Sequence, residues 1–149
     1  MRVVADTGPL VAAVNRRDEA HRLAAALVTQ LGTDLLVPLP VAVEVDHLLR
    51  GRVGPAAARL FIRALASGEH SVAFATPALL RDAADIDAQY ANLDLGLVDG
   101  IVMAIAFQHR LPVLTFDFAH FRAAPSRSGA WRLVVDESQY AEALRFTRS

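Results

Sequence analysis

The stretch from Leu93 to Asp117, LDLGLVDGIVMAIAFQHRLPVLTFD, most constrains the fold, because it carries carboxylates at both ends of an otherwise apolar unit. Asp99 falls in the first turn of a predicted helix, and Pro112 opens a short buried strand that Asp117 follows. The apolar stripe of the helix consists of Val98, Ile101, Val102 and Ile105. Ligands of an open α/β sheet gather outside the carboxyl ends of its strands. We therefore expect the acid at the strand exit to face the acid at the helix entrance.

Short apolar runs alternate with helical patterns along the rest of the chain. Strands are predicted at Arg2–Ala5, Leu35–Val37, Ser71–Ala75, Val113–Thr115 and Trp131–Val135. Helices are predicted from Gly8 onward, from Asp18 to Gly32, over Val41–Leu49, Ala56–Ala66 and Thr76–Tyr90, within 93–117, and over Glu137–Phe146. This alternation indicates an α/β fold with a central, mainly parallel sheet of about five strands flanked by helices.

The length and composition are typical of one domain. A chain of 149 residues, 54% of them hydrophobic, has enough apolar surface to bury a core. We expect residues 1–149 to form a single domain, with 136–149 as a C-terminal helix or tail. The apolar run after Met1 is too short for a signal peptide, and charged residues or proline interrupt every run before the roughly 20 residues of a membrane span. The expectation is a cytoplasmic protein without membrane association.

The charged residues exclude several chemistries. All 15 residues of the Lys+Arg count are Arg, which excludes P-loop lysines and Schiff-base chemistry, and the absence of Cys excludes disulfides and thiolate ligands. The net charge of -1 argues against a broad basic face, so that contacts with nucleic acid would need local Arg clusters. The tight clusters in the sequence are Arg16, Arg17 and Arg22, and Arg50 with Arg52.

Two further acids are candidates for the same site as Asp99 and Asp117. Asp6 ends the first predicted strand, immediately before a helix. Glu44 lies beside an apolar stripe, because Val41 and Leu48 stand three residues before and four residues after it. A partly buried glutamate without an adjacent base either stays protonated or binds a cation. Glu44 is therefore a candidate metal ligand.

Other polar residues receive structural interpretations. Asp46 has Arg50 four residues further on, which predicts a surface ion pair worth a few tenths of a kcal/mol. The spacing Glu44-x-x-His47 matches carboxylate-bridged di-iron sites, but the second such motif that those sites need is missing from the sequence. The remaining histidines considered are isolated in sequence and are interpreted as surface or helix-end groups. These are His21, His70, His109 and His120.

Each candidate acid also has a structural explanation. Asp6 and Asp117 would serve as helix N-caps, Asp99 would complement a helix dipole, and Glu44 would lie over solvent. Taken together, however, three of the four fall at strand exits or helix entrances, where α/β folds bind ligands. Converging carboxylates repel one another, so we expect a divalent cation to hold them together.

These residues give the chain a resemblance to PIN-domain ribonucleases, and among them to VapC-like toxins of bacterial toxin-antitoxin pairs. Four motifs spread over nearly the whole chain carry the resemblance. They are D-T-G-P-L at Asp6 to Leu10, Glu44 in the third helix, D-x-x-L-x-D at Asp94 to Asp99, and L-T-x-D at Leu114 to Asp117. The segment from Phe118 to Phe121 departs from the pattern, because it has no Arg where similar proteins often carry basic residues.

The resemblance implies a PIN-like three-layer α/β/α domain that hydrolyses RNA phosphodiester bonds with one or two Mg²⁺ or Mn²⁺ ions. It also implies an RNA substrate such as tRNA or another structured RNA, a VapB-like antitoxin and a homodimer. The implied metal-binding and catalytic residues are Asp6, Glu44, Asp99 and Asp117, with Asp94 as an accessory acid and Thr7 and Thr115 as supporting hydroxyls. Hard oxygen ligands of this kind suit Mg²⁺ and Mn²⁺.

The number of apolar helix residues also predicts a homodimer, because it exceeds what one small core would bury. Those considered are Leu10, Val11, Val14, Leu60, Phe61 and Leu65. The alternative function is a catalytically weak PIN-like binding module that docks an antitoxin or RNA. A phosphatase or phospho-acceptor with Asp6 as nucleophile is disfavoured, because Gly8 stands where a second acid is needed and the chain has no Lys.

Overall fold

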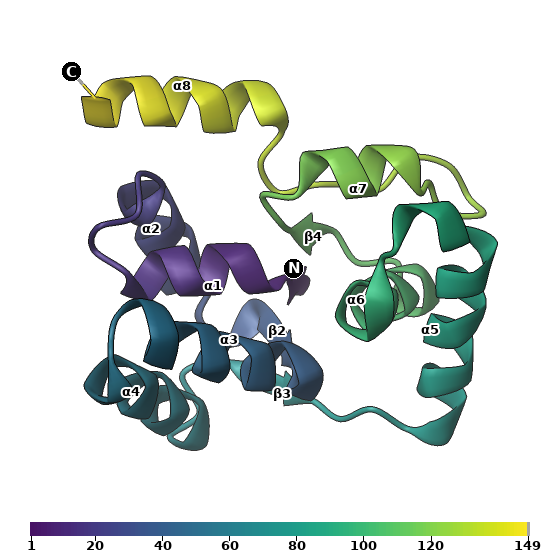
Figure 1. The fold of residues 1–149 in the computed structure, drawn as a ribbon, viewed down its shortest axis with the longest axis horizontal. Coiled ribbons are helices and arrows are strands. Elements are labelled where there is room, and N and C mark those ends of the chain that lie inside the picture. The colour runs from purple at the N-terminus through teal and green to yellow at the C-terminus, as the bar shows by residue number, and fades with distance from the viewer. Residues whose placement is uncertain (149) are drawn as a thin grey trace.

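The computed structural model describes residues 1–148 and contains a four-stranded sheet flanked by helices (Figure 1). All three strand pairs are parallel, and the strand order is β3-β2-β1-β4. The strands are β1 Val3–Ala5, β2 Leu35–Pro38, β3 Ser71–Ala73 and β4 Val113–Leu114. Layers of helix, sheet and helix confirm the predicted α/β fold.

Eight α-helices surround or extend from this sheet within residues 1–148. They are α1 Thr7–Val14, α2 His21–Leu31, α3 Leu39–Arg52, α4 Pro55–Ala66, α5 Pro77–Gln89, α6 Gly96–His109, α7 Phe118–Ala123 and α8 Glu137–Arg148. Short 3-10 turns, Gly32–Asp34 and Ala91–Leu93, precede β2 and α6. Helix α1 packs against α2 and α3, α3 against α4, and α5 against α6. Within the described residues, none of the helices has the length and apolarity that crossing a bilayer requires.

Local sequence accounts for several element boundaries. Thr76 caps α5 through its Oγ1 atom, which accepts a hydrogen bond from Leu79 N at 3.2 Å, and Pro77 follows at the first helical position. The predicted Asp46–Arg50 pair on α3 is confirmed, with the guanidinium Nε donating to both carboxylate oxygens at 3.2 and 3.1 Å. Helix α3 continues through Gly51 to Arg52, beyond its predicted end at Leu49.

The predicted fifth strand, Trp131–Val135, is reduced to a single parallel bridge between Val113 and Leu133. Val113 N donates to Arg132 O at 2.8 Å, and Val134 N donates to Val113 O at 3.0 Å. Strand β4 is only two residues long, and only Val113 bonds to this segment, through its backbone N–H and C=O groups. The segment therefore lies along the edge of the sheet without extending it as a strand.

Helix α6 lies at the centre of the core. All residues from Gly100 to Ala106 are buried, a full circumference of the helix and not only the predicted stripe. A helix that is apolar on all sides belongs inside a protein. Gly100 permits the close approach of α5, because a Cβ atom built there would stand 2.8 Å from Ala83 O. Asp99 directly precedes Gly100. The tight packing of α5 on α6 therefore fixes the position of Asp99 relative to the core.

The sequence predicts six apolar helix residues beyond what one small core needs. Most of them belong to the core. Leu10, Val11 and Phe61 are buried, and Val14 and Leu65 pack against the core. Only Leu60 among the six is exposed, at 69% of its surface. Helix α1 is covered by both α2 and α3, which explains why residues on more than one of its sides are buried. That set of residues is therefore no argument for a dimer.

Candidate metal centre

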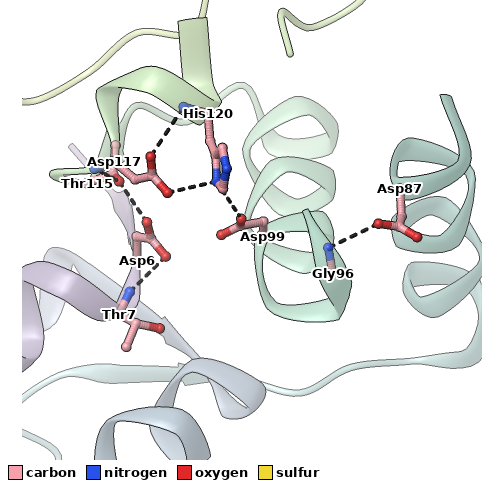
Figure 2. A network of polar contacts seen from close by, with 8 residues as sticks. All are labelled: Asp6, Thr7, Asp87, Gly96, Asp99, Thr115, Asp117 and His120. Carbon is pink, nitrogen blue, oxygen red and sulfur yellow. Dashed lines mark hydrogen bonds and ion pairs between the residues drawn. The ribbon is translucent and has the colours of Figure 1, made fainter. Parts of the chain in front are cut away.

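Asp6 lies at the carboxyl end of β1 and is the N-cap of α1. Its Oδ1 atom accepts a hydrogen bond from Thr7 N at 2.8 Å, and its Oδ2 atom accepts one from Thr115 Oγ1 at 2.7 Å (Figure 2). Only 6% of the residue is exposed. The predicted capping role is therefore real, yet the second carboxylate oxygen bonds to the adjacent strand exit and not to its own helix.

Asp117 stands at the neighbouring strand exit, after β4, and is the N-cap of α7. Its backbone N donates to Thr115 Oγ1 at 2.9 Å, and its Oδ1 atom accepts from His120 N at 3.2 Å. Because β1 and β4 are parallel neighbours, their carboxyl ends meet at one edge of the sheet. The Thr115 hydroxyl bridges the two residues, because it donates to the carboxylate of Asp6 and accepts from the backbone N of Asp117.

His120 lies between Asp117 and Asp99. Its Nδ1 atom is 2.8 Å from Asp117 Oδ2 and 3.3 Å from Asp99 Oδ2, and Figure 2 shows the ring between the two carboxylates. One ligand atom from each of these three residues lies within 4.8 Å of the others. Asp99 reaches this point from the first turn of α6. Two segments, the first turn of α6 and the start of α7, thus converge on one cluster.

The carboxyl groups of the cluster disfavour one another's charge. Burial, followed by the charges of Asp6 and Asp117, raises the pKa of Asp99 to about 6, while the contact with His120 opposes this rise. A carboxyl group that titrates near neutral pH in a group of acids is typical of functional sites. An imidazolium between the two carboxylates offsets their repulsion when the ring is protonated.

Asp6 is perturbed in the same direction. Burial is the largest cause of its raised pKa, and the hydrogen bonds from Thr115 and Thr7 oppose it. The charges of Asp117 and Glu44 raise the pKa of Asp6 further. This coupling places Glu44, which is half-buried on α3, within electrostatic range of the cluster.

The remaining predicted residues differ in how they relate to the cluster. Thr7 is buried beside Asp6, and its Oγ1 atom has no hydrogen-bond partner within residues 1–148. Asp94 is exposed in a left-handed conformation at the end of the 3-10 turn, with φ 50°. Its carboxylate makes no hydrogen bond or ion pair to the described residues. The structure therefore brings Thr7 and Thr115 to the acids but does not join Asp94 to them.

Sequence reasoning missed His120 and Asp87. The signal for His120 was available, because a residue three positions after an N-cap lies over the start of the helix, and Asp117 is such a cap. Asp87 of α5 accepts a hydrogen bond from Gly96 N at 3.0 Å, at the start of α6 (Figure 2). No sequence motif indicates this bond, which joins residues nine apart across a turn.

The residues present fit a divalent metal ion. Two carboxylates and an imidazole within 4.8 Å form a donor set for Mn²⁺ and similar ions, and the carboxylates alone suit Mg²⁺. The unpartnered hydroxyl of Thr7 adds a buried polar atom beside Asp6. A cation would also reverse the mutual repulsion that raises the pKa of Asp99 and Asp6.

Comparisons with known proteins identify the family of the chain. The PIN domain model matches residues 3–125, so the chain belongs to the PIN domain family. The chain is 29% identical over 122 residues to ribonuclease VapC26 of Mycobacterium tuberculosis, a match that covers 81% of this chain and 90% of that protein. It is thus similar to VapC ribonucleases as well as to the broader family.

Solved structures share the fold. The crystal structure of Mycobacterium tuberculosis VapC20, described as a Sarcin-Ricin loop cleaving toxin, has a TM-score of 0.74 and 21% identity, covering 81% of this chain and 94% of that one. VapBC2 from Rickettsia felis, bound to a DNA fragment from its promoter, has a TM-score of 0.61 and 13% identity, covering 84% and 94%. At these identities the likeness concerns the fold.

Proposed function

We propose that this protein is a metal-dependent endoribonuclease and the toxin of a VapBC-like toxin-antitoxin pair. The observation that carries the proposal is the cluster of Asp99, Asp117 and His120, joined to Asp6 through Thr115. Similarity to a VapC ribonuclease over 81% of the chain supports the same activity. The proposed metal is Mg²⁺ or Mn²⁺, with one or two ions.

The proposed ligands are Asp6, Asp99, Asp117 and Glu44. When bound, a divalent ion polarises a phosphoryl oxygen and lowers the pKa of a water ligand. Thr115 holds Asp6 and Asp117 in register, since its hydroxyl bonds to both. His120 faces Asp99 and Asp117 and supplies a nitrogen donor or a proton at its Nδ1 atom. Asp94 is proposed only as an outer, accessory acid.

The proposed substrate is a structured RNA, such as tRNA or a ribosomal RNA loop. The description of VapC20 as a toxin that cleaves the Sarcin-Ricin loop supports this class. The contacts with phosphate would come from exposed Arg residues near helix ends. Candidates are Arg16, Arg17, Arg22, Arg50 and Arg52, all of which are exposed.

A VapB-like antitoxin is the proposed partner, supported by the VapBC2 complex among the similar folds. We also propose a homodimer, now on exposed residues, of which only Leu60 also belongs to the set that the sequence suggested. Besides Met1, the large hydrophobic side chains with more than half of their surface exposed are Val43, Leu60, Phe74, Leu97 and Phe146. Exposed apolar surface is typical of interfaces where it forms a contiguous patch. A protein that sediments as a monomer at micromolar concentrations would contradict the dimer.

Cleavage of mixed RNA by wild type and Asp6→Asn, each with Mn²⁺, with Mg²⁺ and with a chelator, tests the proposed activity. We expect cleavage by wild type with either ion, and none after chelation or in the variant. Cleavage that survives chelation would exclude the metal mechanism. Retention of RNA by wild type without cleavage would instead support the alternative, a PIN-like binding module.

A further inference from the structure

The C-terminal helix α8 lies beyond the residues matched by the family model and contacts the loop that carries Asp117. In Figure 1, α8 lies above α2, and the amino end of α8 lies near the start of α7. Tyr140, one turn into α8, is the residue that reaches the loop. Its ring centroid is 4.7 Å from that of Phe116 and 5.4 Å from that of Phe118, with tilted ring planes.

Phe116 and Phe118 are the two neighbours of Asp117 in the chain. A single ring from α8 therefore contacts the chain on both sides of this acid. Phe118 is buried, and Phe116 is half-buried. The side chain of Asp117 itself is 42% exposed, so its polar contacts with His120 compete with water. Apolar contacts to the flanking rings do not have this competition.

A second set of contacts anchors the same face of α8. Tyr140 and Leu144 pack with Phe116 against a small cluster formed by α1 and the start of α2. The buried residues of this cluster are Ala12, Ala20 and Ala24. Since Asp6 caps α1, the cluster connects α8 to the segment that carries the other buried acid. Burial and the charges of Asp18 and Glu19 raise the pKa of Tyr140, which keeps its hydroxyl neutral.

An ion pair also joins α8 to α7. Arg122, near the end of α7, contacts Glu137, the first residue of α8. Helix α7 contains His120 two residues before Arg122. The start of α8 is thus attached both to the helix that carries His120 and, through Tyr140, to the loop that carries Asp117.

We propose that Tyr140 is a positioning residue of the metal centre, which holds Asp117 toward His120 and Asp99 by stacking on Phe116 and Phe118. The proposal rests on the metal site of the proposed function. It assigns α8 a role at the site although α8 contributes no ligand. Removal of groups that hydrogen-bond to metal ligands typically changes metal affinity about 10- to 100-fold, and we expect an effect at the lower end of this range for Tyr140.

The test compares full-length wild type with Tyr140→Leu, which keeps an apolar side chain but removes the ring. The first measurement is amide hydrogen exchange of the metal-free proteins at Asp117 and His120, whose N–H groups donate to Thr115 Oγ1 and Asp117 Oδ1. Protection at these two amides should fall, while Val4 N, bonded to Pro112 O within the sheet, should stay protected. The second is the Kd for Mn²⁺, which should rise about 10-fold or more.

Tyr140→Phe keeps the ring and should restore both measurements. Leu144→Ala is the matched control, because Leu144 packs in the same cluster one turn further along α8 but has no ring. It should lower the melting temperature without weakening Mn²⁺ binding or local protection. Phe116→Leu removes the partner ring instead and should reproduce the effect of Tyr140→Leu, which keeps the test decisive if Tyr140→Leu does not fold.

The proposal is overturned if Tyr140→Leu keeps wild-type amide protection and wild-type Mn²⁺ affinity. It is also overturned if Leu144→Ala loses as much protection and affinity as Tyr140→Leu, or if Tyr140→Phe does not restore them. The proposed ribonuclease activity fails differently, by the absence of RNA cleavage in wild type. Neither exchange nor Mn²⁺ binding uses RNA, so the two failures are separable.

Discussion

The acidic centre at the strand exits and the aromatic hollow between α5, α6 and residues 125–131 differ in what makes each conspicuous. The hollow has a volume of about 130 Å³, and the rings of Tyr90, Phe107 and Trp131 contribute to its lining. Its shape is that of a ligand pocket. The acidic centre is conspicuous because it gathers carboxyl groups whose pKa values are raised by burial and by each other.

The polar groups on two rings of the hollow are already hydrogen-bonded. Tyr90 Oη donates to Pro125 O at 2.7 Å, and Trp131 Nε1 donates to Ala124 O at 2.7 Å. Its acids, Asp82 and Asp85, are exposed on α5. These two aromatic side chains therefore hold the backbone at Ala124 and Pro125. Concavity alone is a weaker sign of chemistry here than buried charge, whose cost needs a functional explanation.

The strongest test of this difference is RNA cleavage by variants of acids from the two regions. Single replacement of Asp6, Glu44, Asp99 or Asp117 by its amide should lower the rate about 100-fold or more, because a lost metal ligand costs several kcal/mol of transition-state stabilisation. Asp85→Asn, on the hollow, should cleave at the wild-type rate. Initial rates at fixed Mn²⁺ measure both. Wild-type turnover in two of the four site variants would remove the proposed ligand set.

Thermal unfolding with and without Mn²⁺ sharpens the comparison at one residue. Metal-free Asp99→Asn should melt no lower than wild type, because the amide relieves repulsion with Asp6 and Asp117. At a hundredfold excess of Mn²⁺ over Kd, wild type should gain about 2.7 kcal/mol and the variant little. The order of stability then reverses. Equal gains in both proteins would make Asp99 a helix-start charge and not a ligand.

Helix α6 belongs to both regions, since Ala104 and Phe107 line the hollow and Asp99 lies at the acidic centre. Gly100→Ala would place a Cβ atom 2.8 Å from Ala83 O and push α6 away from α5. We expect a loss of about 1–3 kcal/mol in the free energy of unfolding and weaker Mn²⁺ binding. Gly51→Ala is the matched control, because no atom lies within 4 Å of its Cβ position. Denaturant titration should show the control unchanged or slightly more stable, and equal losses in both would exclude a specific role for the α5–α6 contact.

The last expected effect is the pH dependence of the metal-free protein. The pKa of Asp99 is about 6 in the folded state and 3.8 as the ordinary value, so between these pH values the folded protein binds the additional proton. The stability contributed by this group is complete below the lower value and is lost as the pH rises through about 6. The stability of wild type relative to Asp99→Asn should therefore increase as the pH falls across this window, measured by denaturant titration. A difference independent of pH would contradict the raised pKa.

Several features of the fold were predictable because local sequence determines them. Gly8-Pro9 and Thr76-Pro77 mark helix starts, and the strands at Val3–Ala5 and Leu35–Pro38 are short apolar runs, buried throughout as parallel strands require. The fifth strand at Trp131–Val135 was not decided locally. Its apolar pattern fits a strand, but β4 is too short to pair with it beyond Val113.

The positions of Asp6, Asp99 and Asp117 followed from sequence because a strand exit or helix start fixes where a side chain stands relative to the sheet. Their distances and partners did not. The bonds of Thr115 to Asp6 and Asp117 exist because β1 and β4 are adjacent, a pairing between segments more than 100 residues apart. His120 joined the site because α7 begins at Asp117 and turns the ring back toward α6.

The sequence by itself determined the class of fold, the acids and the motifs of the family, because periodicity and residue type act over a few neighbouring positions. Tertiary structure alone decided that His120 lies between two carboxylates, that Gly96 is bonded to Asp87, and that Tyr140 stacks on both neighbours of Asp117. Each of these contacts depends on how helices and strand exits are packed against one another. Packing is a property of the whole chain, so no local pattern encodes it.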